Sequence, residues 1–462
     1  MLFSSIPFLF YFLPAVLILY LITPKKLRNA TLFLVSLFFY GWGEPVYVFL
    51  MVGTILSGFV LGLLIEKFRE KRIGKLFLAL SVIIPLLALG YFKYADFFIE
   101  NFSRAFGIEP KLLGIALPIG ISFYTFQILS YTVDIYRGEV AAQRNPIALG
   151  AYITMFPQLI AGPIVRYRDI AEQLESREHS FDKISSGVRR FAFGLAKKIL
   201  IANQLGELCD AFLASQDKSV AFFWLYGIAF ALQIYFDFSG YSDMAIGLGR
   251  LFGFEFMENF NFPFISKSIT EFWRRWHISL GSWFRDYVYI PLGGNRKGRA
   301  RHIFNILVVW MLTGFWHGAE WNFIAWGLYF AVLLTLEKFF FGKALEKRKF
   351  LSHIYVIFAV LISFVIFSAN NMTEAVTRVF SMFGGGDYPL INAEFIYNLR
   401  SFLPLLAISC IGATPIAKRF FLETKLGRSL AILEPAAVLA LLALSTAYLV
   451  DGSFNPFLYF RF

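Results

Sequence analysis

The feature that most constrains this 462-residue chain is a series of long apolar segments that follow one another from end to end. A helix needs about 20 consecutive apolar residues to cross the hydrocarbon core of a membrane. Several of the runs are short or overlap, so we expect about ten to twelve spans. The runs occupy 3–23, 30–50, 46–65, 76–92, 112–133, 147–165, 197–214, 219–237, 303–318, 321–341, 351–369, 400–417 and 429–450.

The length of these runs predicts an all-α, polytopic integral membrane protein, because a spanning segment must satisfy its own backbone hydrogen bonds. Composition agrees, since 58% of the residues are hydrophobic and only 16% are charged. The run at 147–165 contains proline and glycine, which predicts a re-entrant or broken helix lining a cavity. The stretches 166–198 and 266–302 mix basic and aromatic residues, as in amphipathic helices that lie on anionic lipid.

The charge pattern sets the orientation of the chain and excludes one class of function. The net charge is +12, but the basic residues lie in short loops between apolar runs rather than on one face. This distribution is typical of cytoplasmic loops and does not indicate nucleic-acid binding. It predicts a multi-pass protein of the cytoplasmic (inner) membrane, in contact with lipid, with both termini outside. The loops assigned to the cytoplasm are 24–29, 66–75, 134–149, 166–198, 266–302, 342–350 and 415–428.

Two histidines are the first candidates for chemistry. His277 lies in the polar, basic and aromatic stretch from Ser268 to Gly298, and His317 ends the next apolar run. An ionisable residue at membrane depth is costly and is usually functional. For His277 the alternative is an interfacial anchor, and for His317 it is a satisfied histidine inside the bundle.

Other catalytic arrangements receive little support from the sequence. The spacing of the histidines fits no metal motif, so we expect no metal site. No G-x-S-x-G motif is present. Ser239 lies in FDFSGYSD, between Asp237 and Asp243, and we interpret this segment as a structural break or turn in a helix.

Basic and phenolic side chains supply further candidates. Arg274, Arg275 and Arg285 lie near His277, where their charge would suit the phosphates of a coenzyme A thioester, although cytoplasmic loops carry similar charge. Tyr459 lies in the tail FNPFLYFRF, which otherwise resembles an aromatic belt. Its phenol is a suitable acyl acceptor when a base activates it.

Five segments of the chain together resemble a known family, and they are 117–138, 156–169, 234–254, 259–298 and 314–327. They resemble the membrane-bound O-acyltransferase family, and within it the bacterial branch that modifies cell-surface polysaccharides such as alginate. The resemblance covers about residues 1–345, and 350–450 are only generically similar, so we expect one domain over 1–462 with an aromatic tail at 451–462.

The resemblance implies a helical fold around a central funnel or tunnel. It makes His317, in the sequence WHG with Trp316, the essential histidine, and His277 the second one. It gives Asp286 a supporting role. It also makes Tyr459 a candidate acyl relay, because the tail resembles the end of a small peptide in teichoic acid D-alanylation.

The activity implied is O-acetyl transfer from cytoplasmic acetyl-CoA to an extracellular polysaccharide, through an extracytoplasmic partner of the serine-esterase type. Acetyl-CoA is then a substrate, and no bound cofactor is expected. Transfer of D-alanine or another acyl group to teichoic acid or peptidoglycan stays open. From another class, a transporter without acyl chemistry also stays open, although we find no internal repeat.

Overall fold

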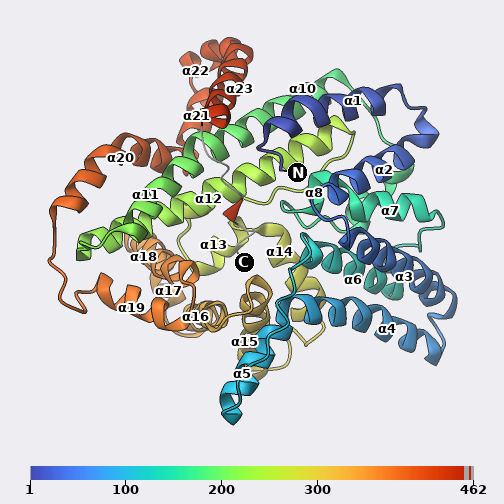
Figure 1. The fold of residues 1–462 in the computed structure, drawn as a ribbon, viewed down its shortest axis with the longest axis horizontal. Coiled ribbons are helices and arrows are strands. Elements are labelled where there is room, and N and C mark those ends of the chain that lie inside the picture. The colour runs from blue at the N-terminus through green and yellow to red at the C-terminus, as the bar shows by residue number, and fades with distance from the viewer. Residues whose placement is uncertain (1, 452–456, 459–462) are drawn as a thin grey trace. The chain divides into compact units, whose positions relative to one another are not determined.

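A computed structural model of the chain describes residues 2–451 and 457–458 (Figure 1). Every regular element in the described residues is a helix, which confirms the all-α prediction. The chain forms two compact units, Met1–Phe191 with Asp243–Met257, and Ala192–Ser242 with Glu258–Phe462. Helices α10 and α12 each contribute residues to both units.

The first unit contains mostly short and medium helices. A π-helix, η1 (Pro7–Phe12), runs into the first α-helix, and a second, η3 (Gly90–Tyr94), connects α4 to α5. The α-helices are α1 (Leu13–Ile22), α2 (Arg28–Gly41), α3 (Tyr47–Phe68), α4 (Arg72–Leu89), α5 (Ala95–Phe106), α6 (Ile121–Arg137), α7 (Pro146–Thr154), α8 (Phe156–Leu159), α9 (Tyr167–Glu175) and α10 (Phe181–Ala196).

The second unit contains the longer helices and three π-helices, η4 (Lys197–Ala202), η6 (Arg285–Tyr289) and η7 (Glu337–Phe341). Its α-helices are α11 (Asn203–Ala214), α12 (Val220–Leu251), α13 (Ile269–Arg275), α14 (Ile278–Phe284), α15 (Arg299–His317), α16 (Trp321–Leu336), α17 (Gly342–Lys347), α18 (Lys349–Ser368), α19 (Met372–Met382), α20 (Ala393–Gly412), α21 (Ile416–Glu423), α22 (Lys425–Leu430) and α23 (Glu434–Asp451).

Seven helical runs among the described residues are long and apolar enough to cross a membrane. This is fewer than the expected ten to twelve, because several apolar runs form short helices, such as α2 with 14 residues and α11 with 12. The seven runs are Tyr47–Phe68, Arg72–Phe106, Val220–Leu251, Trp321–Lys347, Lys349–Ser368, Ala393–Gly412 and Lys425–Asp451.

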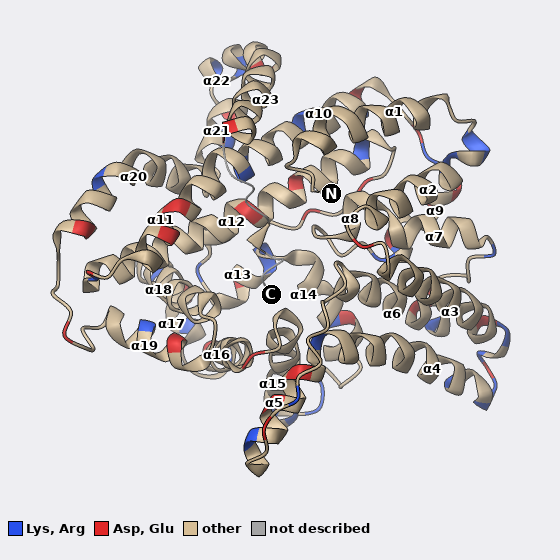
Figure 2. Ribbon diagram, in the orientation of Figure 1, with Lys and Arg blue, Asp and Glu red and all other residues tan. Residues whose placement is uncertain are grey.

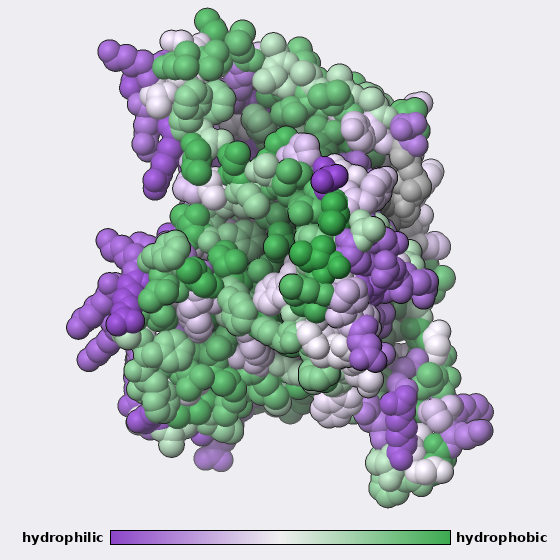
Figure 3. Space-filling view, turned by 90° about the vertical axis from the view of Figure 1, so that its left-hand side faces the viewer, coloured by the Kyte–Doolittle hydropathy of each residue, from purple (hydrophilic) through white to green (hydrophobic). Residues whose placement is uncertain are grey.

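Burial separates one of these spans from the others. In α12, 78% of the apolar window is buried inside the protein, against 11% in the run that contains α22 and α23. Charged residues lie mainly at helix ends and in connecting segments (Figure 2). Hydrophobic side chains cover much of the face in Figure 3, and hydrophilic ones gather near its margins. The chain is therefore a multi-pass integral membrane protein in which α12 is a core helix.

Two expectations about helix breaks have different outcomes. The segment FDFSGYSD lies inside the continuous helix α12, so the break or turn expected around Ser239 is wrong. The glycine is needed for packing, because a Cβ on Gly240 would lie 2.7 Å from the carbonyl oxygen of Gly194. The run at 147–165 is interrupted as expected, since α7 ends before Met155 and the short α8 follows it.

Helices α15 and α16 form the tightest helix pair of the second unit. A Cβ on Gly314 would lie 2.2 Å from the carbonyl oxygen of Phe323, and a Cβ on Gly327 would lie 2.2 Å from that of Trp310. Such contacts require the two backbones to touch, as in other membrane helix pairs with small residues at the crossing. This crossing fixes the end of α15, where His317 lies.

Replacing Gly327 by Ala should therefore force α15 and α16 apart and destabilise the protein by about 1–3 kcal/mol. Gly53→Ala, in helix α3, is the matched control, because a Cβ there meets nothing within 4 Å. That change should leave stability unchanged or raise it by up to about 1 kcal/mol through helix propensity. Thermal unfolding in detergent measures both, and equal midpoints for the two variants would contradict the close crossing.

Candidate active site

His317 lies at the C-terminal end of α15 and is buried, with 7% of its surface exposed. Three aromatic side chains surround its ring. The ring centroids lie 4.9 Å from Trp316, 5.1 Å from Trp326 and 5.3 Å from Phe367, and the last two contacts are edge-to-face. The imidazole is therefore held in one orientation by packing in an apolar environment.

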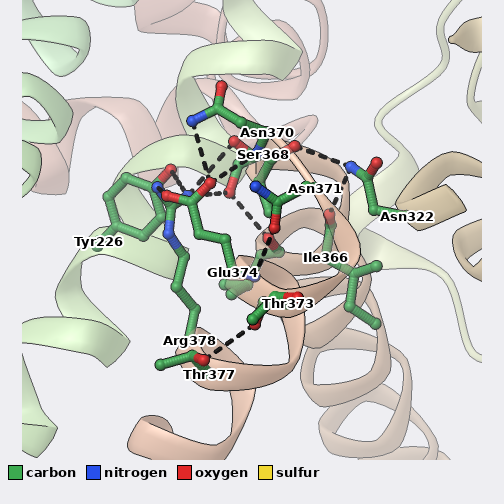
Figure 4. Close-up of polar contacts among 12 residues, drawn as sticks. Tyr226, Asn322, Ile366, Ser368, Asn370, Asn371, Thr373, Glu374, Thr377 and Arg378 are labelled. Carbon is green, nitrogen blue, oxygen red and sulfur yellow. Dashed lines mark hydrogen bonds and ion pairs between the residues drawn. The ribbon is translucent and has the colours of Figure 1, made fainter. Parts of the chain in front are cut away.

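A polar cluster lies at the turn between α18 and α19 (Figure 4). It directly follows Phe367 in the chain, and Phe367 packs against His317. Arg378 is buried and donates from Nη1 to Tyr226 Oη at 3.0 Å and to Ser368 Oγ at 3.1 Å. Its Nη2 forms an ion pair with Glu374. The cluster satisfies the buried guanidinium and fixes the end of α18, because Arg378 on α19 bonds to Ser368 at the end of α18 and to Tyr226 on α12, while Glu374 on its own helix balances its charge.

His277 precedes α14 in a backbone conformation that is rare for its residue type. Its φ is +44°, and Phe262 is the other non-glycine residue with positive φ in the described part of the chain. Such conformations cost free energy and persist where the surrounding structure requires them, often at functional sites. The conformation lets the chain turn between α13 and α14 and directs the imidazole inwards, where it is 1% exposed.

The hydrogen bonds of Asn259 determine the tautomer of His277. The backbone N–H of Ser279 donates to Asn259 Oδ1 at 3.3 Å, and Nδ2 of the same amide donates to Ser242 Oγ at 3.1 Å. Oδ1 is therefore the acceptor, so His277 Nδ1, 3.2 Å away, carries the proton. Nε2 is left with its lone pair and has no hydrogen-bond partner among the described residues.

Burial also decides the charge of His277. Removal from water lowers the pKa of the imidazole from its usual value of 6.5 to about 3. The side chain is therefore neutral at physiological pH. A neutral imidazole with a fixed Nδ1 proton and a free Nε2 is able to accept a hydrogen bond or a proton from a hydroxyl group.

His277 lines a cavity of about 590 Å³ in the second unit. Arg274, Arg285, His302 and Lys338 also line it, whereas none of the described aspartates or glutamates does. The cavity therefore has a basic wall, formed by two arginines and a lysine, and also includes the buried, neutral His277. Such a wall favours a ligand with negatively charged groups.

The arginines predicted to bind donor phosphates divide into two groups. Arg274 lines the cavity and forms no ion pair with a described residue, whereas Arg275 pairs with Glu271 at 2.9 Å and is not in the lining. Arg285 lines the cavity and pairs with Asp286 at 2.7 Å. Asp286 thus orients an arginine at the cavity wall, and Arg274 is the more available of the two arginines in the lining.

His317 lines a different and smaller cavity, of about 30 Å³. Most of its wall is aromatic, and Asp237 is its acidic residue. Phe457 and Leu458, near the end of the chain, also line it. Tyr459 follows them in the sequence but lies outside the described residues.

Trp316 contacts both histidines, and Phe238 contacts His277. The ring of Trp316 lies 6.2 Å from that of His277 and 4.9 Å from that of His317, measured between centroids. Phe238 packs edge-to-face on His277 at 4.6 Å and also lines the small cavity. The structure thus brings the two predicted histidines to neighbouring cavities, with Trp316 in contact with both.

Sequence reasoning missed Asn259 and Asp237. Asn259 is part of the segment 259–298, but nothing in its local sequence distinguishes it from a loop asparagine. Asp237 does carry a signal, because an acidic residue in an apolar run is costly and usually has a role. The expected break around Ser239, which does not exist, concealed that role.

Residues 139–385 match the model of the membrane-bound O-acyltransferase family. This match covers more than half of the chain, and it includes both histidines. The chain therefore belongs to the membrane-bound O-acyltransferase family, and it is a multi-pass membrane O-acyltransferase.

Three relatives within this similarity have more specific names than the family. The chain is 40% identical to a probable alginate O-acetylase of Azotobacter vinelandii, over the full length of both proteins. It is 34% identical to a peptidoglycan O-acetyltransferase of Helicobacter pylori, over 83% of this chain and 80% of that protein. A teichoic acid D-alanyltransferase of Bacillus subtilis is 33% identical over 48% of this chain and 59% of its own.

Replacing Asn259 by Asp should make acyl transfer sensitive to pH. A carboxylate beside Nδ1 favours the imidazolium, so the pKa of His277 should rise toward its ordinary value. Transfer should then fall as pH falls through the raised value, because Nε2 becomes protonated. In the parent protein His277 stays neutral, so it should contribute no such fall between about pH 5 and 8.

The measurement is the pH dependence of acyl transfer by purified protein. Asn305→Asp is the matched control, because Asn305 is also buried but donates to the carbonyl oxygen of Gly294 rather than to a histidine. Profiles of the same shape for the two variants would show that Asn259 does not control the protonation of His277.

Proposed function

We propose that this protein transfers an acetyl group from cytoplasmic acetyl-CoA across the membrane, for O-acetylation of an extracellular polysaccharide similar to alginate. The acceptor class follows from the names of the relatives that align with most or all of the chain. The observation that supports acetyl-CoA as the donor is the basic cavity at His277, which has no described acidic residue in its lining.

The donor in this proposal is acetyl-CoA, used as a substrate. Its phosphates are anionic and its pantetheine arm is long and largely neutral. Arg274 and Arg285 suit the phosphates, since guanidinium groups form paired, charge-assisted hydrogen bonds with them. The arm would extend toward His277, where the wall becomes neutral and aromatic.

In the chemical step, an acceptor hydroxyl attacks the thioester carbonyl. A C–O bond forms, the C–S bond breaks, and the hydroxyl proton passes by way of a histidine to the departing thiolate of coenzyme A. His317 is the proposed base, because it lines the same cavity as Phe457 and Leu458. His277, with its free Nε2, would orient the thioester side of the reaction.

Tyr459 is the proposed first acceptor. Its phenol would form an aryl ester, which then passes the acetyl group to an extracytoplasmic partner of the serine-esterase type. The described neighbours Phe457 and Leu458 support this assignment, since both line the cavity of His317.

The orientation follows from the basic loops. With most lysines and arginines in the cytoplasm, the protein lies in the cytoplasmic membrane with both termini outside. Acetyl-CoA would then enter from the cytoplasm and the tail would face the partner and the polysaccharide. Peptidoglycan is the second candidate acceptor, because the peptidoglycan O-acetyltransferase of Helicobacter pylori aligns with this chain over most of the length of both proteins.

His317→Ala should reduce the transfer of labelled acetyl from acetyl-CoA by about 10²–10⁴-fold, the usual contribution of a general base. Tyr459→Phe should leave no label on the protein, because the aryl ester is not formed. His353→Gln is the control, since His353 lines neither cavity. Purified protein in liposomes, with the label on the protein counted, measures all three.

The outcomes separate the parts of this proposal. Unchanged transfer by His317→Ala would remove His317 as the proposed base. Unchanged transfer by Tyr459→Phe would remove only the relay. Labelled D-alanyl groups accepted from a carrier-protein thioester, in place of acetyl groups from acetyl-CoA, would replace the donor.

Arg274→Gln should raise the KM for acetyl-CoA by about tenfold, because loss of one charge-assisted contact costs roughly 1.5–3 kcal/mol. Arg275→Gln is the matched control and should leave KM near its original value, since Arg275 pairs with Glu271 away from the cavity. Initial rates at varied acetyl-CoA concentration measure both. Equal KM values would exclude Arg274 from donor binding.

A further inference from the structure

Asp237 is an acidic residue on the buried span α12, and the proposed chemistry gives it no role. It is 1% exposed, and its neighbours in the cavity of His317 are mainly aromatic and aliphatic. A carboxylate in such a place is costly unless it is paired and fully hydrogen-bonded. Its two oxygen atoms must therefore be accounted for.

The first oxygen is neutralised by Lys198. The distance from Lys198 Nζ to Asp237 Oδ1 is 2.6 Å, and the two side chains are 3% and 1% exposed. Lys198 lies on the π-helix η4, an irregularity that is frequent at functional sites. Gly240 permits this pairing, because a Cβ there would lie only 3.2 Å from the backbone nitrogen of Lys198.

The second oxygen binds the chain's own tail. The backbone N–H of Leu458 donates to Asp237 Oδ2 at 2.8 Å. Phe457 packs beside it, with ring centroids 4.9 Å from Tyr241 and 5.8 Å from Phe238. Both tail residues are buried, at 3% and 6% exposed.

We propose that Asp237, neutralised by Lys198, is a docking site for the C-terminal tail, and that it holds Phe457 and Leu458 beside His317. Asp237 is a positioning residue, because it acts on the tail backbone and not on the acyl group. Its importance for transfer depends on the relay proposed above, since Tyr459 is the next residue along the chain. The docking itself does not depend on the relay.

A pair of neutral double variants isolates the hydrogen bond to Leu458. Lys198→Met with Asp237→Asn removes both charges and keeps a side-chain oxygen for the Leu458 N–H. Lys198→Met with Asp237→Leu removes both charges and the oxygen. Neither variant leaves a buried charge unpaired, so they differ mainly in the docking contact.

The readout is the accessibility of the tail to a thiol reagent. Leu458→Cys is introduced into full-length protein in detergent, in a background with Cys209 and Cys410 replaced by Ala, which removes both native cysteines. Asp451→Cys, at the exposed end of α23, reports general accessibility. Thermal unfolding of every variant checks that the fold is intact.

The thiol introduced by Leu458→Cys should react about tenfold or more slowly than the thiol introduced by Asp451→Cys, because labelling follows the population of the open form. This difference in labelling rate is expected in the parent and in the Asn variant, which is Lys198→Met with Asp237→Asn. In the Leu variant, which is Lys198→Met with Asp237→Leu, the two labelling rates should become similar, and acetyl transfer should fall. Equal protection of the tail thiol in the Asn and Leu variants would overturn the proposal, as would fast labelling of that thiol in the parent.

The proposed relay through Tyr459 is tested separately from the proposed docking of the tail. Tyr459→Phe in the same background should abolish label on the protein and leave the tail thiol protected. Protection of this thiol with undiminished transfer in Tyr459→Phe would therefore remove the relay and retain the docking site. Loss of protection in the Leu variant without loss of transfer would show that docking does not position the acceptor.

Discussion

A polar group buried among apolar helices has no water to bond with, so its partners must come from the protein. This requirement explains the arrangement of the second unit. Asn259 pairs with His277, Lys198 pairs with Asp237, and Glu337 accepts the first backbone N–H groups of α13. In each case a helix end or a functional side chain is fixed because its polar atoms have one set of partners.

Close backbone packing and aromatic filling complete the site. The glycine contacts between α15 and α16 fix His317 at the end of its helix, and aromatic rings fill the space around it. The result is two cavities of different chemistry. The larger has a basic wall suited to an anionic donor, and the smaller is aromatic and contains two residues of the tail.

The sequence was sufficient for the helical class and the family, because apolar length and compact motifs are local properties. The sequence did not show which arginine faces the cavity, because Arg274 and Arg275 are adjacent and equally basic. In the structure Arg275 pairs with Glu271, and Arg274 lines the cavity. Asn259 was not identified because its partner His277 lies 18 residues away across an irregular segment. Asp237 was misread because a glycine that lets helices touch looks the same in sequence as one that breaks a helix.

The position of Trp316 has a further consequence for the cell. A passage wide enough for an acyl group is also wide enough for water and ions, and a leak would dissipate the membrane potential, which is worth about 2.3 kcal/mol per charge at 100 mV. Trp316 packs against both histidines, and Phe238 packs against His277 and lines the small cavity. Replacing either ring with a small side chain would therefore open space beside a histidine, in a protein whose membrane must stay closed to ions.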